Sequence, residues 1–446
     1  MKITADFTKI TGRIKPMHGV GQPPVLGIDD RFMHYLGEAG IPYSRLHDMG
    51  GPYGGFRFVD IPNIFRDFDA DETLPESYDF TFTDWLITAL MKQGTEPFFR
   101  LGVTIENAWQ LKAYRIYPPA DFAKWARICE HIIRHYNEGW ANGFRYGIKY
   151  WEIWNEPEGG CDGKGGAMWL GTREEYFRLY EITANHLKAC FGDSIKVGGY
   201  ASCGFYAVDD DPSCEGFPGG TYTNDFQYFL YYFHEFLKYI SSEEHKAPLD
   251  FYSWHTYSQP DEALKMEDYC RRTMAKYGFG DTEDILNEWN PTHDAILRST
   301  PMAAARVLAM MLGMQKKPVG MLNFYDARIG TSTYSGMFNP DTWRPYLTYY
   351  AFMMFNDAYK LKDEIETASD DDKIYVGGAA KDGKAVLLIA NPENKSVKAE
   401  LTLSGVDFAA AEVLMIDASH QYTPTGIRIT DGKLTIPAHS CVEIRF

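Results

Sequence analysis

The chain of 446 residues contains no run of 18 apolar residues, so we expect no membrane-spanning helix and no membrane partner. Its first ten residues hold neither an apolar segment nor a small-residue cleavage site, and no signal peptide is visible. Only seven cysteines occur, an odd count without the spacing of metal ligands. These absences predict a cytoplasmic protein whose cysteines are mostly free thiols.

Positive charge is also scarce, because 44 Lys and Arg face 61 Asp and Glu and give a formal net charge of −17. Clustered Lys and Arg supply the affinity of proteins for phosphate backbones, so we expect a neutral substrate and no nucleic acid. The sequence lacks a P-loop, a GxGxxG segment, an HExxH segment and a Ser or Cys triad signature. His131 and His135 have the i, i+4 spacing of a metal pair, but no third ligand is near, and we interpret them as packing or outward-facing residues. We therefore expect neither a metal nor another cofactor.

Short apolar or β-branched segments alternate with longer amphipathic ones from about residue 15 to residue 355. This alternation is typical of a parallel sheet whose strands are joined by helices. Eight strands are expected, which is the number that closes a (β/α)8 (TIM) barrel of the α/β class. The expected strands are 18–20, 43–47, 97–102, 150–154, 195–199, 251–255, 284–287 and 320–325, and the expected helices are 79–93, 121–136, 173–190, 226–240 and 301–314.

The pattern changes after about residue 365, where apolar and polar residues alternate with a period of two. Strands are expected at 373–376, 385–390, 397–403, 411–416, 428–429 and 441–446, with turns at Asp382-Gly383 and Asp431-Gly432. This part predicts a small C-terminal antiparallel β-sandwich domain, to which residues 2–9 could add a strand. We expect a catalytic barrel over 13–362 and an accessory domain over 363–446 together with 1–12.

The segment Trp-Glu-Ile-Trp-Asn-Glu-Pro ends at Pro157 and carries the strongest chemical signal. Active residues of (β/α)8 enzymes lie at the carboxyl ends of strands, and Glu156 follows the apolar strand 150–154. A glycosidase needs a carboxylic acid that stays protonated until it reaches the leaving oxygen. We predict that Glu156 is this acid rather than one member of a structural Glu–Arg pair.

A second carboxylate, Glu288, follows the apolar strand 284–287. It lies 288 − 156 = 132 residues after Glu156, which leaves room for three further βα units. The two carboxylates would then lie on the fourth and seventh barrel strands and face each other across the mouth. A retaining mechanism needs carboxyl groups only about 5–5.5 Å apart, so we predict Glu288 as the nucleophile.

Other polar residues are expected at the same rim of the barrel. Asn155 could bind a sugar 2-hydroxyl, and Tyr257 could donate a hydrogen bond that holds Glu288 ionised. The remaining candidate substrate-binding residues at strand ends are His47, His255 and Tyr325. The acidic, glycine-containing segment 209–223 is expected to be a loop insertion that could cap the cleft.

Several segments in order resemble glycoside hydrolase family 39 of clan A, the family of β-xylosidases and α-L-iduronidases. They include Asp121–Trp125 (DFAKW), Trp151–Pro157 (WEIWNEP), Lys196–Gly199 (KVGG) and Asp250–Tyr257 (DFYSWHTY), within a similarity over about residues 15–360. The resemblance implies Glu156 as acid/base, Asn155 as its usual neighbour and Glu288 as nucleophile, and a C-terminal β-sandwich is also typical of the family. Two departures are clear: Leu286–Asn290 (LNEWN) replaces the family's ITEYN, and Tyr325 stands where its xylosidases tend to have Trp.

The resulting expectation is a retaining glycoside hydrolase that cleaves terminal glycosides of short oligosaccharides, as a β-xylosidase does. β-Galactoside, β-glucoside and α-L-arabinoside remain open as substrates, and a transglycosylase would share every residue named. A non-catalytic carbohydrate-binding barrel predicts loss of one carboxylate, and both are present. Self-association into a homo-oligomer is a further expectation from the resemblance.

Overall fold

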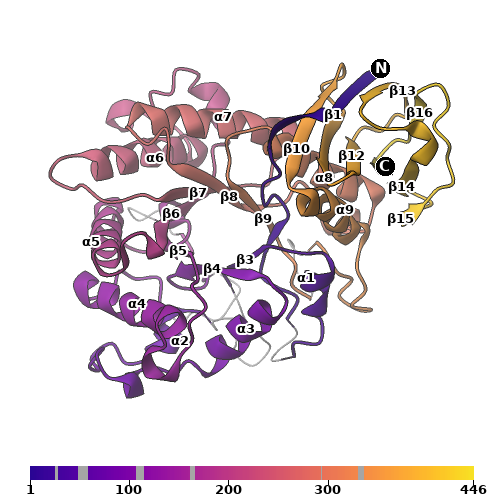
Figure 1. Ribbon diagram of the computed structural model, residues 1–446. Helices are drawn as coiled ribbons and strands as arrows, with labels where there is room; N and C mark the ends of the chain where they lie inside the picture. Colours follow the sequence, from indigo (N-terminus) through magenta and orange to yellow (C-terminus); the bar gives the residue numbers. More distant parts are fainter. Residues whose placement is uncertain (26–28, 49–58, 107–114, 161–165, 293, 330–335) are drawn as a thin grey trace.

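The computed structural model contains a closed barrel of eight parallel strands with a second, mostly antiparallel β domain beside it (Figure 1). The expected fold class, a (β/α)8 barrel with a small C-terminal β domain, is therefore confirmed. The structure describes residues 1–25, 29–48, 59–106, 115–160, 166–292, 294–329 and 336–446.

All eight expected barrel strands are present in the expected order, and each pairs in parallel with its neighbours. The carboxyl ends of parallel strands meet at one rim, so residues that follow these strands gather there. The barrel strands are β2 (Gly19–Gly21), β3 (Tyr43–Leu46), β4 (Glu96–Leu101), β5 (Tyr150–Ile153), β6 (Lys196–Ser202), β7 (Phe251–Thr256), β8 (Glu283–Trp289) and β9 (Met321–Tyr325).

Helices surround the barrel, and four of them, α4, α5, α6 and α8, begin at a residue whose side chain caps the first turn. The Thr172 side chain accepts a hydrogen bond from the Glu175 backbone, and the Glu175 carboxylate accepts one from the Thr172 backbone, which forms a capping box. The α-helices are α1 (His34–Glu38), α2 (Ile61–Ile64), α3 (Thr81–Lys92), α4 (Phe122–Asn137), α5 (Arg173–Phe191), α6 (Asp225–Ser241), α7 (Pro260–Lys276), α8 (Pro301–Gln315) and α9 (Leu347–Leu361). Short 3-10 helices are η1 (Pro75–Ser77), η2 (Trp140–Asn142), η3 (Pro157–Gly159), η5 (Gly192–Ser194), η6 (Val208–Asp210), η7 (Pro218–Gly220), η8 (Ala295–Leu297) and η9 (Phe408–Ala410).

The histidine pair of α4 has the packing role expected from the sequence. His135 is buried, and its ring nitrogens bond the Asp84 carboxylate and the Trp140 carbonyl, each at 2.9 Å. His131 bonds the carbonyl of Arg127 one turn earlier, at 2.8 Å. The two rings therefore have separate partners and do not converge on one point.

The inside of the barrel has an apolar layer below a polar one. Phe98, Tyr150, Phe251, Ile285 and Met321, from five strands, pack into one buried cluster. Because side chains of a strand alternate between its two faces, the residues two positions further along also face inward. Every one of these next residues is polar and buried: Arg100, Glu152, Ser253, Asn287 and Asn323. The apolar layer closes the barrel, and the polar layer forms the floor below the mouth.

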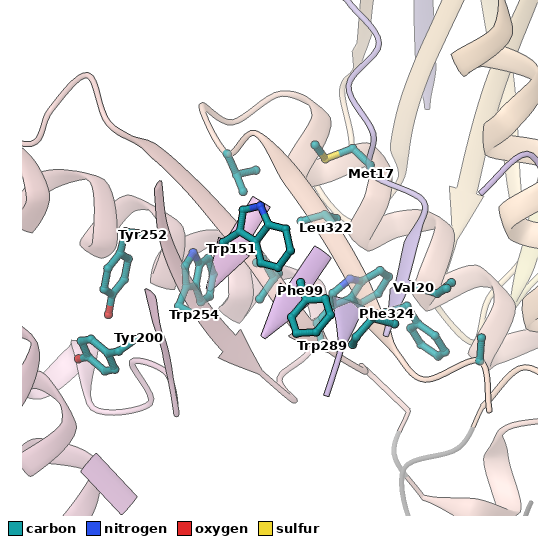
Figure 2. Packing of buried hydrophobic residues seen from close by; sticks show 14 of the residues in the cluster. Met17, Val20, Phe99, Trp151, Tyr200, Tyr252, Trp254, Trp289, Leu322 and Phe324 are labelled. Carbon is teal, nitrogen blue, oxygen red and sulfur yellow. The ribbon is translucent and has the colours of Figure 1, made fainter. Parts of the chain in front are cut away.

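The opposite faces of the strands pack against the surrounding helices in a large apolar core. Figure 2 shows large aromatic side chains from several barrel strands in this core, among them Trp151, Trp254 and Trp289. All three are almost completely buried. Much of the chain's high aromatic content therefore serves packing between sheet and helices.

The second domain is one hydrogen-bonded sheet of nine strands in the order β15-β14-β17-β12-β11-β10-β1-β13-β16. The amino-terminal strand β1 pairs antiparallel with β10 and parallel with β13, so the expected strand from this end of the chain is present. The position of the boundary at 362/363 stays a prediction. The strands are β1 (Lys2–Arg13), β10 (Asp363–Ser369), β11 (Tyr375–Lys381), β12 (Lys384–Asn391), β13 (Val397–Ser404), β14 (Glu412–Ile416), β15 (Gln421–Pro424), β16 (Lys433–Ile436) and β17 (Ser440–Arg445).

Both faces of the centre of this sheet are buried. On β12, Leu387 and Ile389 belong to the domain's own core, whereas Val386 and Leu388 belong to the core shared with the barrel. Helices α8 and α9 contact the sheet at β11 and β12 (Figure 1). The two domains therefore share one apolar interface, and alternate residues of a single strand serve the two sides of it.

One expected strand of this domain is wrong. Residues 428–429 lie in irregular chain, and the structure has strands β15 and β16 on either side of them. Asp431 and Gly432 both have positive φ, 51° and 70°, and form the tight turn that leads into β16. A two-residue apolar alternation carries too little signal to identify a strand, and here its backbone has no neighbour to pair with. Helices α7 and α9 were not expected from the sequence either.

Candidate active site

Glu156 lies just beyond strand β5, in a backbone conformation that few residues adopt. Its φ is 43° and its ψ is 46°, and its backbone N–H donates to the Ala201 carbonyl on β6 at 3.0 Å. The following Pro157 disfavours the ordinary helical conformation at Glu156 and begins η3. Such left-handed residues cost about 1–3 kcal/mol and persist where the surroundings hold them in place. The Asn-Glu-Pro sequence thus fixes the direction of one carboxyl group.

Glu288 lies inside strand β8 rather than beyond its end, because the strand continues to Trp289. The pairing with β7 steps from Trp254–Leu286 to His255–Glu288, so β8 carries one extra residue at this point. A bulge of this kind lets two successive residues face the same side of a sheet. Asn287 and Glu288 accordingly both contact residues inside the barrel.

The two carboxylates face each other across the barrel mouth, as the sequence predicts. One carboxylate oxygen of each and a ring nitrogen of His255 all lie within 4.8 Å of one another. The Glu156 side chain is 22% exposed and that of Glu288 is 9% exposed, so both can be reached from outside. This arrangement pairs a carboxyl group that can donate a proton with a carboxylate that can attack.

Arg45 of β3 connects the buried polar layer of the barrel to the carboxylate of Glu288 through hydrogen bonds. It is buried and donates to Glu152 at 2.8 Å, to Glu288 at 3.0 Å and to the Asn155 side-chain oxygen at 2.5 Å. Asn287 donates to the other oxygen of Glu152. The guanidinium thus orients Glu288 and Asn155 together, and Glu152 balances its charge in the interior.

The electrostatic surroundings of the two carboxyl groups differ. Burial raises the pKa of Glu156 to about 7, and the positive charge of Arg45 opposes this only in part. Burial also raises the pKa of Glu288, and the neighbouring Glu156 adds to this rise, whereas the charge of Arg45 and a hydrogen bond from Tyr257 oppose it. Glu156 is therefore partly protonated at neutral pH, and Glu288 has two partners, Arg45 and Tyr257, that favour its ionised form.

His255 and Tyr257, both predicted site residues, contact the carboxylates directly. His255 Nδ1 lies 2.7 Å from Glu156 Oε1, and its Nε2 lies 3.9 Å from Glu288 Oε2. Burial lowers the pKa of His255 to about 4, so its ring is neutral at neutral pH. The Tyr257 hydroxyl donates to Glu288 Oε1 at 2.6 Å, which is the contact that the sequence suggested.

Asn155 and His47 each keep a buried polar atom without a hydrogen-bond partner among the described residues. These atoms are the Asn155 amide nitrogen and His47 Nδ1. His47 Nε2 lies 3.2 Å from the Asp48 carboxylate, and burial holds the pKa of His47 well below its usual value. A buried polar atom without a partner costs free energy, and a sugar hydroxyl would satisfy it.

Tyr325 at the end of β9 also reaches this rim. Its hydroxyl accepts a hydrogen bond from Gln22 at 2.7 Å and donates to Asp48 at 3.4 Å. Burial raises the pKa of Asp48 to about 6.

Four residues of the site were not predicted from the sequence: Arg45, Glu152, Gln22 and Asp48. Arg45 and Glu152 share one sequence signal: each is a charged residue two positions after an aromatic residue of the same strand, Tyr43 and Tyr150 respectively.

The segment 209–223 is anchored to helix α7 by hydrogen bonds. Buried Asp211 accepts from the backbones of Glu215 and Gly216, each at 2.9 Å, and from the Tyr269 hydroxyl of α7 at 2.7 Å. Lys276 of the same helix donates to the Cys214 carbonyl at 3.0 Å. The segment is thus packed onto α7, and its role as a cap over the cleft stays a prediction.

Glu156, His255 and Glu288 each have one possible metal-ligand atom, and these three atoms are close enough together to surround a metal ion. Both oxygens of Glu288 already accept hydrogen bonds, one from Arg45 at 3.0 Å and the other from Tyr257 at 2.6 Å, so a metal ion would have to displace one of these donors. The arrangement therefore suits proton transfer and nucleophilic attack better than metal binding.

Among the described residues, no helix is both long and apolar enough to cross a membrane.

Comparison with known proteins identifies the family. The sequence model described as Glycosyl hydrolases family 39 matches residues 37–294 of this chain. A β-xylosidase of Geobacillus stearothermophilus is 26% identical over 265 residues, which cover 55% of this chain and 44% of that protein. A β-xylosidase of Caldicellulosiruptor saccharolyticus is 24% identical over 322 residues, 65% of this chain and 54% of that protein. The chain spans about half the length of these curated relatives.

Solved structures share the fold over almost their whole length. A glucosidase from Croceicoccus marinus superimposes with a TM-score of 0.78 at 18% identity and covers 100% of this chain and 98% of that one. A GH39 β-xylosidase from Caulobacter crescentus gives a TM-score of 0.68, also at 18% identity, and covers 100% and 99%. At these identities the superpositions support the barrel and its attached β domain.

Proposed function

The chain belongs to glycosyl hydrolase family 39, and from this we propose that it is a retaining glycoside hydrolase with Glu156 as acid/base and Glu288 as nucleophile. The observation that carries the proposal is the short gap between the two carboxylates, whose nearest oxygens lie within 4.8 Å. Retaining enzymes hold their carboxyl groups about 5–5.5 Å apart, whereas inverting enzymes need about 6.5–9.5 Å to admit a water molecule. The site leaves room for direct attack by a carboxylate.

In the first step Glu288 attacks the anomeric carbon while Glu156 protonates the departing oxygen. Arg45 and Tyr257 each hold one oxygen of Glu288, so the attacking carboxylate is already oriented. In the second step Glu156, now ionised, removes a proton from water, which displaces Glu288 from the sugar. A pKa of about 7 suits a group that must donate and then accept a proton near neutrality.

We propose further that the substrate is the terminal sugar of a short oligosaccharide, as for a β-xylosidase. Two curated relatives are β-xylosidases, which supports this choice. The unpaired amide of Asn155 would bind the sugar 2-hydroxyl, and His47 would bind another hydroxyl. β-Galactosides, β-glucosides and α-L-arabinosides remain alternative substrates. Transglycosylation remains an alternative reaction, and acceptor sugars added to the assay would reveal it.

The deciding experiment is a panel of 4-nitrophenyl glycosides tested with the wild type and with Glu288→Ala. We expect the wild type to release nitrophenol from one or a few sugars and the variant to release none. Azide should restore turnover of Glu288→Ala and give a glycosyl azide of inverted configuration, because a small anion can fill the space of the lost carboxylate. Normal hydrolysis by the variant would refute the nucleophile assignment. Failure of the wild type on every sugar and on natural oligosaccharides would favour a non-catalytic binding barrel.

The acid role of Glu156 has its own signature. Glu156→Ala should slow substrates with poor leaving groups far more than activated aryl glycosides, because only the former need protonation of the leaving oxygen. Equal losses on both kinds of substrate would contradict the acid role. Location in the cytoplasm and self-association stay predictions from the sequence.

A further inference from the structure

A second group of reactive side chains lies on the outside of the barrel, between helices α4 and α5. His186 and Cys190 are one turn apart on α5 and therefore lie on the same face of that helix. Glu130 reaches the same point from α4. The three donor atoms lie within 4.8 Å of one another.

One ring nitrogen of His186 faces both of the other donors. Its Nε2 lies 2.6 Å from Glu130 Oε2 and 3.8 Å from Cys190 Sγ. Zinc binds nitrogen at about 2.0–2.1 Å and sulfur at about 2.3 Å. A tetrahedral centre with these bond lengths places its nitrogen and sulfur roughly 3.6 Å apart. The His186–Cys190 distance is close to this, and the Glu130–His186 pair would need to open by less than about 1 Å.

We propose that Glu130, His186 and Cys190 form a binding site for a divalent ion of borderline softness, with Zn²⁺ as its best-suited occupant. Carboxylate, imidazole and thiolate are the three protein ligands of zinc, and water would complete the tetrahedron. Cys190 binds as the thiolate, and its proton passes to solvent.

The surroundings of the three ligands support this assignment. Arg134 Nε donates to Glu130 Oε1 at 2.8 Å, which fixes the carboxylate and leaves Oε2 directed at His186. Outer contacts of this kind orient metal ligands. The charge of Arg134 is shared with Glu138, and its guanidinium lies over the Phe191 ring at 5.0 Å. The His186 side chain is 29% exposed, so an ion can enter from solvent.

The site would link the two helices on either side of strand β5, which leads to Glu156. Ion binding should stabilise the folded chain, because an unfolded chain does not hold the three ligands together. It uses none of the residues assigned to sugar hydrolysis. Its success or failure is therefore independent of the proposed function.

The test is a titration of the full chain with Co²⁺, which reports a thiolate ligand through a charge-transfer band in the near ultraviolet. We expect one equivalent to give this band, Zn²⁺ to remove it by competition, and Zn²⁺ to raise the melting temperature of the apo protein. Cys190→Ser and His186→Ala should lose the band, and each should weaken Zn²⁺ binding by about tenfold or more. His245→Ala is the matched control, because His245 also pairs with a glutamate of α5, Glu181 at 3.2 Å. That variant should behave as the wild type.

A second measurement needs only the wild type and so does not depend on the folding of variants. Zn²⁺ should protect Cys190 from alkylation by iodoacetamide, measured by peptide mass, and leave Cys203 unchanged. Absence of a thiolate band, or a band that survives in Cys190→Ser, would overturn the proposal. Protection of Cys203 without protection of Cys190 would also overturn it, since Cys203 lies near the carboxylate pair.

Discussion

Replacing Tyr257 by phenylalanine removes one hydroxyl group that donates to Glu288 at 2.6 Å. This hydrogen bond lowers the pKa of Glu288, so its loss must raise that pKa. Hydrogen bonds to charged groups contribute about 1.5–3 kcal/mol, and one pKa unit corresponds to about 1.36 kcal/mol. The pKa of Glu288 should therefore rise by about 1 to 2 units.

The assay is the pH dependence of kcat/KM on the best 4-nitrophenyl glycoside. In the proposed mechanism Glu288 must be ionised to attack, so activity should be lost as the pH falls through its pKa. The acidic limb of the Tyr257→Phe profile should move to higher pH by about 1 to 2 units, while the basic limb, set by Glu156, should move little.

Tyr206→Phe is the matched control for this change. The Tyr206 hydroxyl accepts a hydrogen bond from the Tyr257 backbone at 3.0 Å and therefore serves the loop rather than the carboxylate. The acidic limb of the Tyr206→Phe profile should therefore lie at the same pH as that of the wild type. A uniform loss of activity in Tyr257→Phe with an unmoved acidic limb would refute the reasoning, because the hydroxyl would then position the site without tuning the charge of Glu288.

Three further predictions concern the neighbouring residues. Burial raises the pKa of Glu156 to about 7, so Glu156 loses its proton as the pH rises through that value. We expect kcat/KM to fall over the same range, because the proposed acid can then no longer protonate the leaving group. A profile that stays flat above about pH 7 would contradict the assignment. Arg45→Met should lower the free energy of unfolding in urea by about 3–5 kcal/mol, because Glu152 stays buried without its cation. Adding Glu152→Gln should recover part of this loss, and no recovery would show that the charge pair is not its cause. Asn155→Ala should lower kcat/KM about tenfold on a glycoside with a 2-hydroxyl and much less on the matching 2-deoxy glycoside. Equal losses on the two glycosides would exclude a hydrogen bond between Asn155 and the sugar 2-hydroxyl.

The barrel could be predicted from the sequence because its signals are local. Strands come from short apolar or β-branched runs, helices from longer segments between them, and their alternation defines the fold. The carboxylates were predictable for the same reason, since Glu156 and Glu288 stand beside apolar strands in Trp-Asn-Glu-Pro and Leu-Asn-Glu-Trp. Where the local signal was weak, as at 428–429, the expectation was wrong. Pairing partners, not propensity, decide such short segments.

The charged floor of the site was not predictable in the same way. Arg45 bonds Glu152 and Glu288, which lie 107 and 243 residues away along the chain. Taken singly, a charged residue within an apolar strand gives no indication of its partner. The proposed metal site shows the same division, because the spacing of His186 and Cys190 is visible in the sequence but Glu130 comes from another helix.

The sequence by itself determined the barrel and the β domain and pointed to Glu156 and Glu288 as the two candidate carboxylates, because strand periodicity and the approximate ends of strands depend on neighbouring residues alone. Only the tertiary structure decided how those carboxylates are held. The bulge in β8 turns Glu288 inward, Arg45 bridges three strands, and burial separates the environments of Glu156 and Glu288. These features depend on which distant groups share the low-dielectric interior, and closure of the barrel brings those groups together.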